Sequence, residues 1–527
     1  MPNISKFYTL ILFLAFAFSD AIGQTAGDAT MLPTARNNFR LDAHQLAGFI
    51  LDEQIDSCKS ALITKFYTER DYQYAWVNEQ RLTRQALTFW SNYQDFLSYS
   101  ADSALRNPNL FKRMVSLAKP DYTFASADTS LQKVELAMTT LFLNFIDHAY
   151  AGKVNPKDLQ WNILRKRLPL FEILNQFVAG AELKDIVPIY PMYYSMKEKL
   201  DRLKKLEEAR WSDIIDNGKL YKLGDTGAIV QAVKCRLNTL GDLPEDDGTN
   251  FYSSEFEAAV INFQKRHGLA NDGIIGPKFI KAINIPITTK IEKVRINMER
   301  MRWMPVDDAE RKVVVNIPEF RLRAYERGKE AIAMDIVVGK TANRTAIFSD
   351  QIRNVVFSPY WNIPESIVKD EILPGIKENP SYLAQHNMEI TGRRNGLPVI
   401  RQKPGSKNAL GRVKFIFPNQ YSIYLHDTPA KDLFELRKRA FSHGCIRVAE
   451  PVKLASYLLK AQPQWTAKKI VSAMNANTER WIKIEHPVQI FISYFTAWVD
   501  QAGALNFRDD LYHRDEELAA CLFDNSK

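Results

Sequence analysis

The feature that most constrains this fold is a change of hydrophobic period near residue 311 of a 527-residue chain. Before that point apolar side chains recur every three or four residues, which is typical of amphipathic helices. After it, β-branched runs such as residues 313–317 are separated by short polar turns, which is typical of strands. A chain of this length exceeds what one hydrophobic core usually organises, so we expect a multidomain α+β protein.

The first half of the chain begins with a predicted helical scaffold over residues 38–205. Leu136, Leu143 and Ile146 follow three- and four-residue steps and predict one buried helix face. Turn-forming residues at 152–156 then end that helix. No combination of residues in this region predicts catalysis, so we interpret it as a scaffold.

A second predicted module spans residues 220–286 and contains three short helices. Asp225 is placed to cap the first helix, and Gly241 to end it. A tight turn at 272–277 precedes the third helix. The buried stripe predicted for the first helix consists of Val230, Val233, Leu237 and Leu240.

The second half is predicted to be a mostly antiparallel β domain over residues 311–470, reached through a linker helix at 291–310. Residues 366–411 interrupt the strand pattern, first as a helix and then as a basic, loop-like stretch. Because this insertion lies between core strands, we predict a lid over the active site, with a decorative insertion as the alternative. Residues 471–527 form a C-terminal extension that packs on the catalytic or scaffold domain and ends in a polar tail.

The N-terminus resembles an export signal. Lys6 precedes an apolar run at residues 7–18, which is short for a membrane span. Small residues Ala21 and Gly23 occupy the −3 and −1 positions of a cleavage site. We therefore predict a signal peptide at residues 1–23, with an uncleaved anchor as the alternative.

Charge and cysteine content restrict the function only weakly. The net charge of +9 and pI near 9.0 favour polyanionic surroundings such as nucleic acid, anionic lipid or an acidic wall polymer. No block of like charges stands out, so a solvated basic surface is the simpler interpretation. Four cysteines are few for an exported disulfide scaffold, and Cys58 and Cys235 are predicted to be buried in helices.

One cysteine differs from the others because of its neighbours. Cys445 follows Gly444 in a short turn beside His443, and His426 ends a predicted strand upstream. A thiol becomes an effective nucleophile when an imidazole takes its proton and N–H groups await the oxyanion. We therefore predict Cys445 as a nucleophile and His426 as its general base, or as its partner in a thiolate–imidazolium pair.

The residues around Cys445 are assigned to the turn and to the substrate. Gly444 permits close approach, so the N–H groups of Gly444 and Cys445 can point at one oxygen. Arg447 stays charged and is suited to hold a substrate carboxylate. Ser442 and His443 are expected to shape the turn and line the cleft.

Three other interpretations of this stretch remain open from the residues alone. His426, His443, Cys445 and Asp427 are all competent zinc ligands, although a His-x-Cys step rarely lets both side chains reach one ion. Cys445 would also serve as a redox cysteine, but it has no partner nearby in sequence. A buried inert thiol is the third interpretation, and the polar neighbours weigh against it.

Ser-His-Gly-Cys-Ile-Arg at 442–447, after Leu-His-Asp-Thr-Pro at 425–429, resembles the L,D-transpeptidase catalytic domain of the YkuD type. The module at 220–286 resembles a three-helix peptidoglycan-binding domain. The order of modules is similar to that of the large periplasmic YcbB-like subfamily. Further stretches that fit this subfamily lie at 337–340, 361–364, 404–411, 414–419 and 494–500. One departure is Ala346, where the family commonly has proline after threonine.

The resemblance implies a substrate and a set of roles. Enzymes of this family attack the carbonyl of the third stem-peptide residue, expel D-alanine and form a 3→3 cross-link. By this resemblance Cys445 is the nucleophile and His426 is the base. The turn at His443 and Gly444 is the oxyanion site. The positions that line the cleft and contact substrate are Tyr424, Trp361, Arg447 and Ser442. The family needs no metal and no cofactor.

The resemblance also implies partners and a location. We expect donor and acceptor stem peptides of peptidoglycan as partners, with other cell-wall synthesis enzymes as further candidates and no nucleic acid. The location implied is the periplasm or cell envelope, with membrane contact only through the N-terminal segment. The alternatives are an L,D-carboxypeptidase that uses water as acceptor, an acceptor amine on a wall-linked protein, and a non-catalytic wall-binding scaffold.

Overall fold

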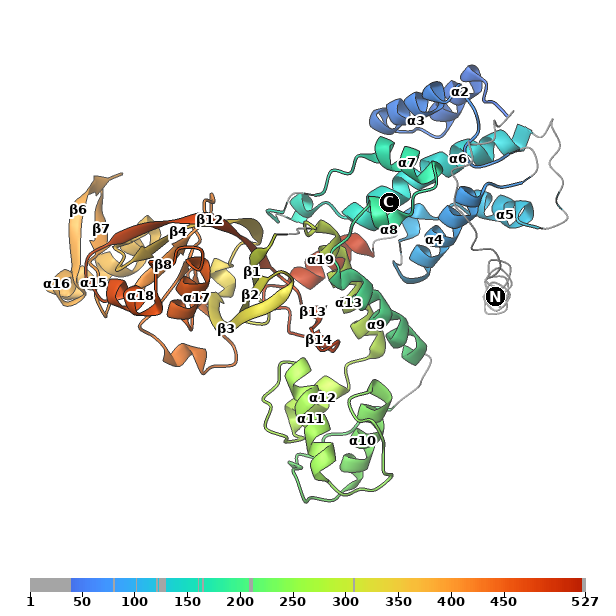
Figure 1. Cartoon of the computed structure of the whole chain (residues 1–527). Helices are drawn as coiled ribbons and strands as arrows, with labels where there is room; N and C mark the ends of the chain where they lie inside the picture. Colours follow the sequence, from blue (N-terminus) through green and yellow to red (C-terminus); the bar gives the residue numbers. More distant parts are fainter. Residues whose placement is uncertain are drawn as a thin grey trace.

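The computed structural model describes residues 39–523, except 79–80, 101, 120–121, 123–128, 160, 164, 208–211 and 307–308. The predicted signal at residues 1–23 lies outside the described residues. Within them, no helix combines the length and the apolar character that crossing a membrane requires. Figure 1 shows three lobes that meet near one helix: a helical lobe, a small three-helix lobe and a β-rich lobe.

The helical lobe holds the predicted scaffold. Leu136, Leu143 and Ile146 are fully buried, which confirms the predicted helix face. The chain leaves this helix through a π-helical turn, and Gly152 adopts φ 96°, which favours glycine. The helices of this lobe are α2 (Ala43–Asp52), α3 (Ser57–Glu69), α4 (Arg84–Ser100), α5 (Pro108–Leu117), α6 (Thr129–Ile146), α7 (Leu170–Val178), α8 (Leu183–Ile186) and α9 (Met192–Glu207).

The small lobe has the three predicted helices, α10 (Ala228–Leu240), α11 (Ser254–Arg266) and α12 (Pro277–Ile283). Its core includes the predicted stripe, since Val230, Val233 and Leu237 are fully buried while Leu240 is half-buried. Gly241 ends α10 in the left-handed region, as predicted. The prediction that Asp225 caps the start of α10 is wrong.

Gly227 is the N-cap of α10, and the Asp225 carboxylate instead accepts the Lys222 N–H within the preceding turn. The two helix cysteines are also a correction. Cys58 and Cys235 were predicted to be buried, and both lie exposed on their helices.

Helix α13 (Ile287–Trp303) occupies the junction of the lobes (Figure 1). It was predicted as a linker helix, and most of its side chains are in fact buried. It packs on α9, on β13 (Ala497–Val499) and on α19 (Arg514–Leu522). Its buried charges are paired, because Arg300 binds Asp515 at 2.6 Å and Arg302 binds Glu299.

The β-rich lobe is built on a nine-stranded, mostly antiparallel sheet. Its order is β10-β3-β11-β9-β8-β4-β12-β1-β2, and an added pairing of β2 with β3 closes the sheet on itself. The strands are β1 (Arg311–Asn316), β2 (Arg321–Glu326), β3 (Lys329–Gly339), β4 (Phe348–Phe357), β8 (Val413–Ile416), β9 (Leu425–His426), β10 (Ala440–Ser442), β11 (Ile446–Val448) and β12 (Arg480–Ser493).

The insertion between β4 and β8 differs from its prediction. The predicted helix is present as α14 (Glu365–Ile367), a π-helical turn at Val368–Ile372, α15 (Leu373–Glu378) and α16 (Tyr382–Gln385). The stretch predicted as a loop is instead a small sheet of β5 (Trp361–Asn362), β7 (Leu397–Gln402) and β6 (Met388–Arg394). Asn395 and Gly396 join β6 to β7 with positive φ, a hairpin signal that the basic composition obscured.

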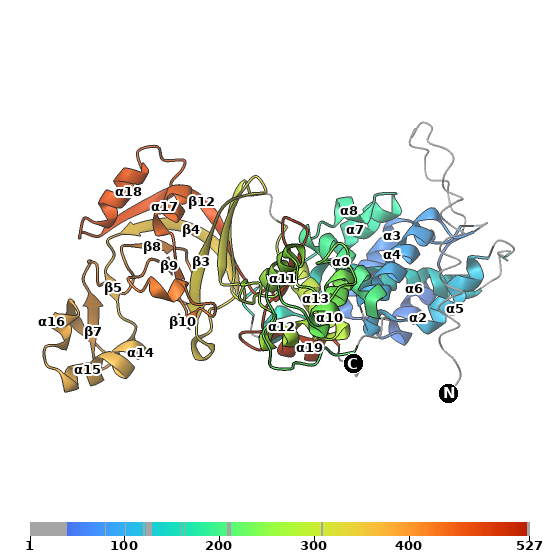
Figure 2. The ribbon, with the colours of Figure 1, turned by 90° about the horizontal axis from the view of Figure 1, so that it is seen from below.

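The C-terminal segment is packed rather than a polar tail. Helices α17 (Pro451–Leu458) and α18 (Ala467–Met474) cover the sheet, and Figure 2 shows both beside β12. Beyond β12 come β13, β14 (Leu505–Phe507) and α19. Tyr512 and Leu518 from this segment are fully buried in the core of the β-rich lobe.

Candidate active site

Strand pairing brings the two predicted motifs together. Cys445 lies in the turn between β10 and β11, and β11 runs parallel to β9. In this register Arg447 lies opposite His426. The Ile446 N–H donates to the Tyr424 carbonyl at 3.1 Å, which fixes the turn beside the end of β9. Segments far apart in sequence therefore form one site.

The turn is held by its own serine. Ser442 is 2% exposed, and its hydroxyl donates to the Cys445 carbonyl at 2.5 Å while it accepts the Gly444 N–H at 3.1 Å. Gly444 has φ 117°, a conformation that side chains rarely adopt. Ser442 thus shapes the turn, and the Gly444 N–H, an expected oxyanion donor, is bonded to the Ser442 hydroxyl in the free protein.

The Cys445 thiol is half-buried at the protein surface. Its sulfur lies 3.6 Å from the Ser422 carbonyl, and it is hydrogen-bonded to the hydroxyl of Tyr424. Burial raises the pKa of the thiol, while the hydrogen bonds from Tyr424 and the charge of Arg447 lower it. The balance favours a neutral thiol in the free protein.

The His426 imidazole is buried and neutral. Its Nδ1 lies 2.5 Å from the Asp427 carbonyl, which can only accept, so Nδ1 carries the proton. The Leu410 carbonyl is a second acceptor beside the ring. Burial, and then the charge of Arg447, lowers the pKa of His426 to about 4. The ring is therefore a proton acceptor at neutral pH.

Asp427 holds the loop that carries this histidine. Its carboxylate accepts the Arg412 N–H at 2.9 Å and binds the Lys431 ammonium at 2.6 Å. Gly411 gives it room, because a Cβ at that position would lie 2.4 Å from the Asp427 carboxylate. Asp427 therefore positions His426 through the backbone.

Tyr424 connects the base to the thiol. Its ring centroid lies 5.7 Å from that of His426, and its hydroxyl bonds to Cys445. Among the hydrogen bonds of the described residues, none joins the His426 ring directly to the Cys445 sulfur. Catalytic hydrogen bonds are often long in a free enzyme and tighten when substrate binds. The Arg447 guanidinium acts on both groups, and its buried Nε has no hydrogen-bond partner in the described part of the chain.

The insertion reaches the turn through one side chain. His443 is 41% exposed and its Nε2 lies 3.0 Å from a carboxylate oxygen of Glu371, which belongs to the insertion. Trp361, predicted to line the cleft, lies in β5 and packs on the apolar cluster of the insertion. The insertion thus contacts the turn through Glu371, while Trp361 is partly buried against the insertion's apolar cluster.

Two residues that the sequence analysis missed support the turn from behind. Thr345 is fully buried, and its hydroxyl donates to the Gly444 carbonyl at 2.8 Å. The Tyr512 hydroxyl donates to the Gly339 carbonyl at 2.6 Å and accepts the Thr345 N–H at 3.3 Å. No local pattern marks these contacts, because the partners are far apart in sequence.

The side chains that the zinc interpretation would bring together do not converge. His443 contacts Glu371, whereas His426 is hydrogen-bonded to a backbone carbonyl. In the part of the chain that the structure describes, no three His, Cys, Asp or Glu side chains are grouped as a metal ion would require.

Three regions of the chain match known domain families. Residues 310–471 match the YkuD family, described as the L,D-transpeptidase catalytic domain. Residues 61–200 match the scaffold domain, and residues 226–283 match the "Putative peptidoglycan binding domain".

Individual relatives are similar over part of the chain. A Haemophilus influenzae protein named "Putative L,D-transpeptidase" is 33% identical over 298 residues, which is 52% of this chain and 59% of that protein. The match thus spans well under two thirds of the relative's length. A solved L,D-transpeptidase from Stackebrandtia nassauensis is 13% identical, with 53% of this chain and 97% of that chain covered and a TM-score of 0.23. A solved L,D-transpeptidase from Mycobacterium smegmatis is 11% identical, with 35% of this chain and 58% of that chain covered and a TM-score of 0.20.

The half-buried thiol therefore lies inside the region that matches a catalytic family, and a wall-binding module precedes it in the chain. The chain carries a catalytic domain of the YkuD L,D-transpeptidase family, together with a scaffold domain and a peptidoglycan-binding domain.

Proposed function

We propose that this protein is an L,D-transpeptidase that forms 3→3 cross-links in peptidoglycan through a Cys445 acyl-enzyme. The observation that carries the proposal is the packing of Cys445, Tyr424, His426 and Arg447 around the β9–β11 pairing. A nucleophile, a base and a cation for a substrate carboxylate are the groups that acyl transfer from a peptide requires.

Proton transfer begins the reaction. His426 takes the Cys445 proton at Nε2, and the Sγ attacks the carbonyl carbon of the third stem residue. The resulting oxyanion is stabilised by N–H groups of the turn, for which the amides of His443 and Cys445 are the candidates. When the intermediate collapses, the bond to the D-alanine nitrogen breaks and His426 returns its proton to that amine.

The second half-reaction releases the enzyme. The side-chain amine of an acceptor stem attacks the thioester carbonyl and gives a proton to His426. The carbon–sulfur bond breaks, and the sulfur regains a proton from the imidazolium. Every proton is returned, so no cofactor is consumed.

Arg447 is suited to couple substrate binding to this chemistry. Its charge lowers the pKa of His426, which weakens the imidazole as a base in the free protein. A substrate carboxylate bound to Arg447 would offset that charge and raise the pKa of His426 toward the pH at which general-base catalysis is most effective. The base would thus become stronger only when substrate is in place.

A product analysis tests the proposal. The purified protein is incubated with disaccharide-tetrapeptide, and products and intact protein are read by mass spectrometry. We expect cross-linked dimer, and a tripeptide adduct on Cys445 that is absent from the Cys445→Ala variant. Cys235→Ala is the matched control, because that thiol is exposed on the peptidoglycan-binding domain and should not affect the reaction.

The other outcomes identify the alternatives. Tripeptide without dimer would make the protein an L,D-carboxypeptidase, in which water takes the acyl group. If no product forms, the remaining alternative is a non-catalytic wall-binding scaffold. Activity that survives Cys445→Ala would refute the proposed nucleophile.

The same proposal includes the place of action. The peptidoglycan-binding and catalytic domains support stem peptides as partners and the cell envelope as the location. When cells that express the protein are fractionated, we expect it in the cell-envelope fraction, with a processed N-terminus near residue 24.

A further inference from the structure

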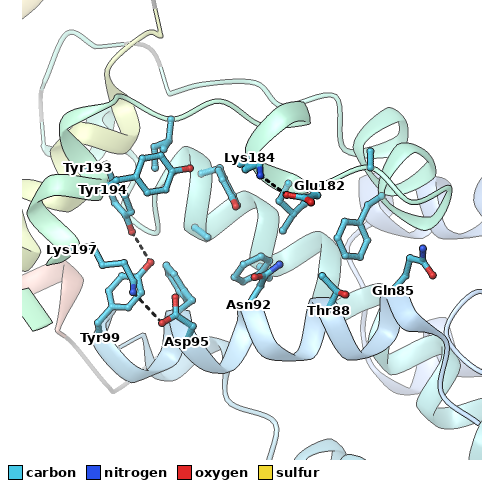
Figure 3. Close-up of a pocket in the computed structure, with 18 of the residues that line it drawn as sticks. Gln85, Thr88, Asn92, Asp95, Tyr99, Glu182, Lys184, Tyr193, Tyr194 and Lys197 are labelled. Carbon is cyan, nitrogen blue, oxygen red and sulfur yellow. Dashed lines mark hydrogen bonds and ion pairs between the residues drawn. The ribbon is translucent and has the colours of Figure 1, made fainter. Parts of the chain in front are cut away.

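A cavity in the scaffold domain lies outside the chemistry described so far. It has a volume of about 410 Å³ and lies between α4, α9 and the segment around α8. Figure 3 shows the labelled side chains of α4 in a row along one side of it, with Tyr194 and Lys197 near one end. Pockets of this size are typical of small-molecule and oligomer subsites.

Helix α4 presents a polar stripe to this cavity. Gln85, Thr88, Asn92, Asp95 and Tyr99 are separated by steps of three and four residues, so they share one helix face. At about 1.5 Å per residue the stripe extends roughly 20 Å. In the described part of the chain, no hydrogen bond uses the side chains of Gln85, Thr88 or Asn92. These amides and the hydroxyl are available to a ligand.

The aromatic walls of the cavity are fixed in place. The hydroxyls of Tyr99 and Tyr193 lie 3.1 Å apart, and Arg302 of α13 donates to the Tyr193 hydroxyl at 2.7 Å. Tyr194 stands edge-to-face on Tyr193 and is 51% exposed, so one tyrosine ring is presented to solvent at the mouth. Rigid aromatic faces cost little entropy when a ligand packs on them.

The charges at the cavity are largely paired with each other. Lys197 binds Asp95 at 3.1 Å, and Lys184 binds Glu182 at 2.7 Å, as Figure 3 shows. An anionic polymer would find few free cations here, and a cation few free carboxylates. The remaining groups are aromatic faces, amides and a hydroxyl. They fit an extended, uncharged ligand that has apolar faces and many hydroxyl and amide groups.

We propose that this cavity binds the glycan strand of peptidoglycan as a run of N-acetylated amino sugars. The pyranose faces would pack on the exposed ring of Tyr194, and the acetamido groups would bond to Asn92 and Gln85. The choice of ligand rests on the proposed action on peptidoglycan, whereas the cavity itself does not involve Cys445.

Helix α13 connects the cavity to the rest of the molecule. Arg302 of α13 donates to the Tyr193 hydroxyl, and Arg295 of the same helix donates to the Tyr99 carbonyl at 2.7 Å. Helix α13 also binds the C-terminal segment through Arg300 and Asp515. A glycan strand in the scaffold would thus be held in a fixed relation to the catalytic domain, which favours delivery of its stem peptide.

Calorimetry with a defined sugar tests the inference. The full chain carrying Cys445→Ala, which removes turnover, is titrated with the β-1,4-linked tetramer of N-acetylglucosamine and with cellotetraose, which lacks acetamido groups. We expect binding of the first and at least fivefold weaker binding of the second. Tyr194→Ala and Asn92→Ala should each weaken binding by about fivefold or more, since one hydrogen bond or aromatic contact is lost.

Matched variants on the same helix provide the control. Leu87→Ala and Ser91→Ala change exposed residues of α4 that do not line the cavity, and should leave binding unchanged. Tyr194 is exposed, so its truncation tests the site even where Asn92→Ala lowers stability.

Three outcomes would decide against the inference. Equal binding of the two sugars, unchanged binding in both cavity variants, or competition by a sugar-free stem peptide would overturn it. Binding in the cavity by a protein that forms no cross-links would instead refute only the proposed function.

Discussion

At the scale of single residues, burial governs the ionisation of Cys445 and His426, the proposed catalytic pair, and Tyr424 and Arg447 modify it. Tyr424 donates to the sulfur, and Arg447 contributes positive charge to both the thiol and the imidazole. The free protein should therefore hold a neutral thiol beside a neutral imidazole. The motif alone left open whether the pair is neutral or ionic, because the pKa values depend on burial rather than on residue type.

Tyr424→Phe should raise the pKa of the Cys445 thiol. The variant removes a hydrogen bond that stabilises the thiolate, so alkylation by iodoacetamide at pH 8 should slow, and its pH profile should move to higher pH. Tyr421→Phe is the control, because that hydroxyl lies in the same loop and bonds to Gln420. An unchanged alkylation profile in Tyr424→Phe would show that the hydroxyl does not act on the sulfur.

Arg447→Met should raise the pKa of His426. The guanidinium disfavours the imidazolium, so its removal should move the pKa upward from about 4 toward the ordinary value of about 6.5. The measurement is an NMR titration of the His426 ring protons. Arg412→Met, whose guanidinium binds Asn475, should leave that titration in place. A fall in the His426 pKa would contradict the proposed electrostatics.

At the scale of elements, the C-terminal segment supports the turn that carries Cys445. Tyr512 bonds to Gly339 and Thr345, and Thr345 in turn bonds to Gly444. Such contacts join elements from opposite ends of the domain. They could not be predicted, since hydrophobic period reports which face is buried and not which distant group it meets.

Tyr512→Phe should lower both stability and activity. It leaves the Gly339 carbonyl and the Thr345 N–H without their partner, at a cost of about 1–3 kcal/mol in the free energy of unfolding. Urea denaturation and the rate of cross-linking measure the two effects. Tyr457→Phe loses a comparable bond to the Tyr325 carbonyl but lies away from the turn, so it should lose stability alone. Equal activity in the two variants would separate the C-terminal segment from catalysis.

The insertion shows how element prediction failed. Its basic side chains suggested a loop, yet two of them, Arg393 and Arg394, end an exposed edge strand, where charges discourage pairing with other chains. The Asn-Gly pair at 395–396 was the local signal for a hairpin. The helical lobe was easier to predict, because its apolar stripes repeat over several turns.

At the scale of the whole molecule, α13 joins the lobes through buried charged groups. Lys290 is 3% exposed, lies between the rings of Phe263 and Phe507 at 5.9 Å from each, and has a pKa lowered to about 7 by burial. Phe263 belongs to the peptidoglycan-binding domain and Phe507 to the C-terminal segment. The joint between these parts therefore contains a lysine that burial leaves only about half charged near neutral pH.

Lys290→Met should stabilise the protein near neutral pH. Because the pKa is lower in the folded state, unfolding takes up a proton between about pH 7 and 10, so stability falls as pH drops through that window. The methionine should add about 2–4 kcal/mol at pH 7, and the gain should vanish near pH 10. Thermal unfolding at both pH values measures this difference.

Lys293→Met provides the opposite case on the same helix. Lys293 donates to the Arg508 carbonyl at 2.6 Å and lies near Asp515, so its loss should destabilise the joint. A destabilising Lys290→Met would mean that its ammonium remains charged and paired in the folded protein.

The sequence by itself determined the helix-to-strand order, the three-helix module, the Cys445 and His426 motifs and the family resemblance. These depend on local period, on turn chemistry and on short motifs. Only the tertiary structure decided that Trp361 packs against the insertion, that α13 is buried, and that Thr345 and Tyr512 support Gly444. The physical reason is that hydrogen-bond partners and burial are set by contacts between distant segments, and no local pattern encodes which segments will meet.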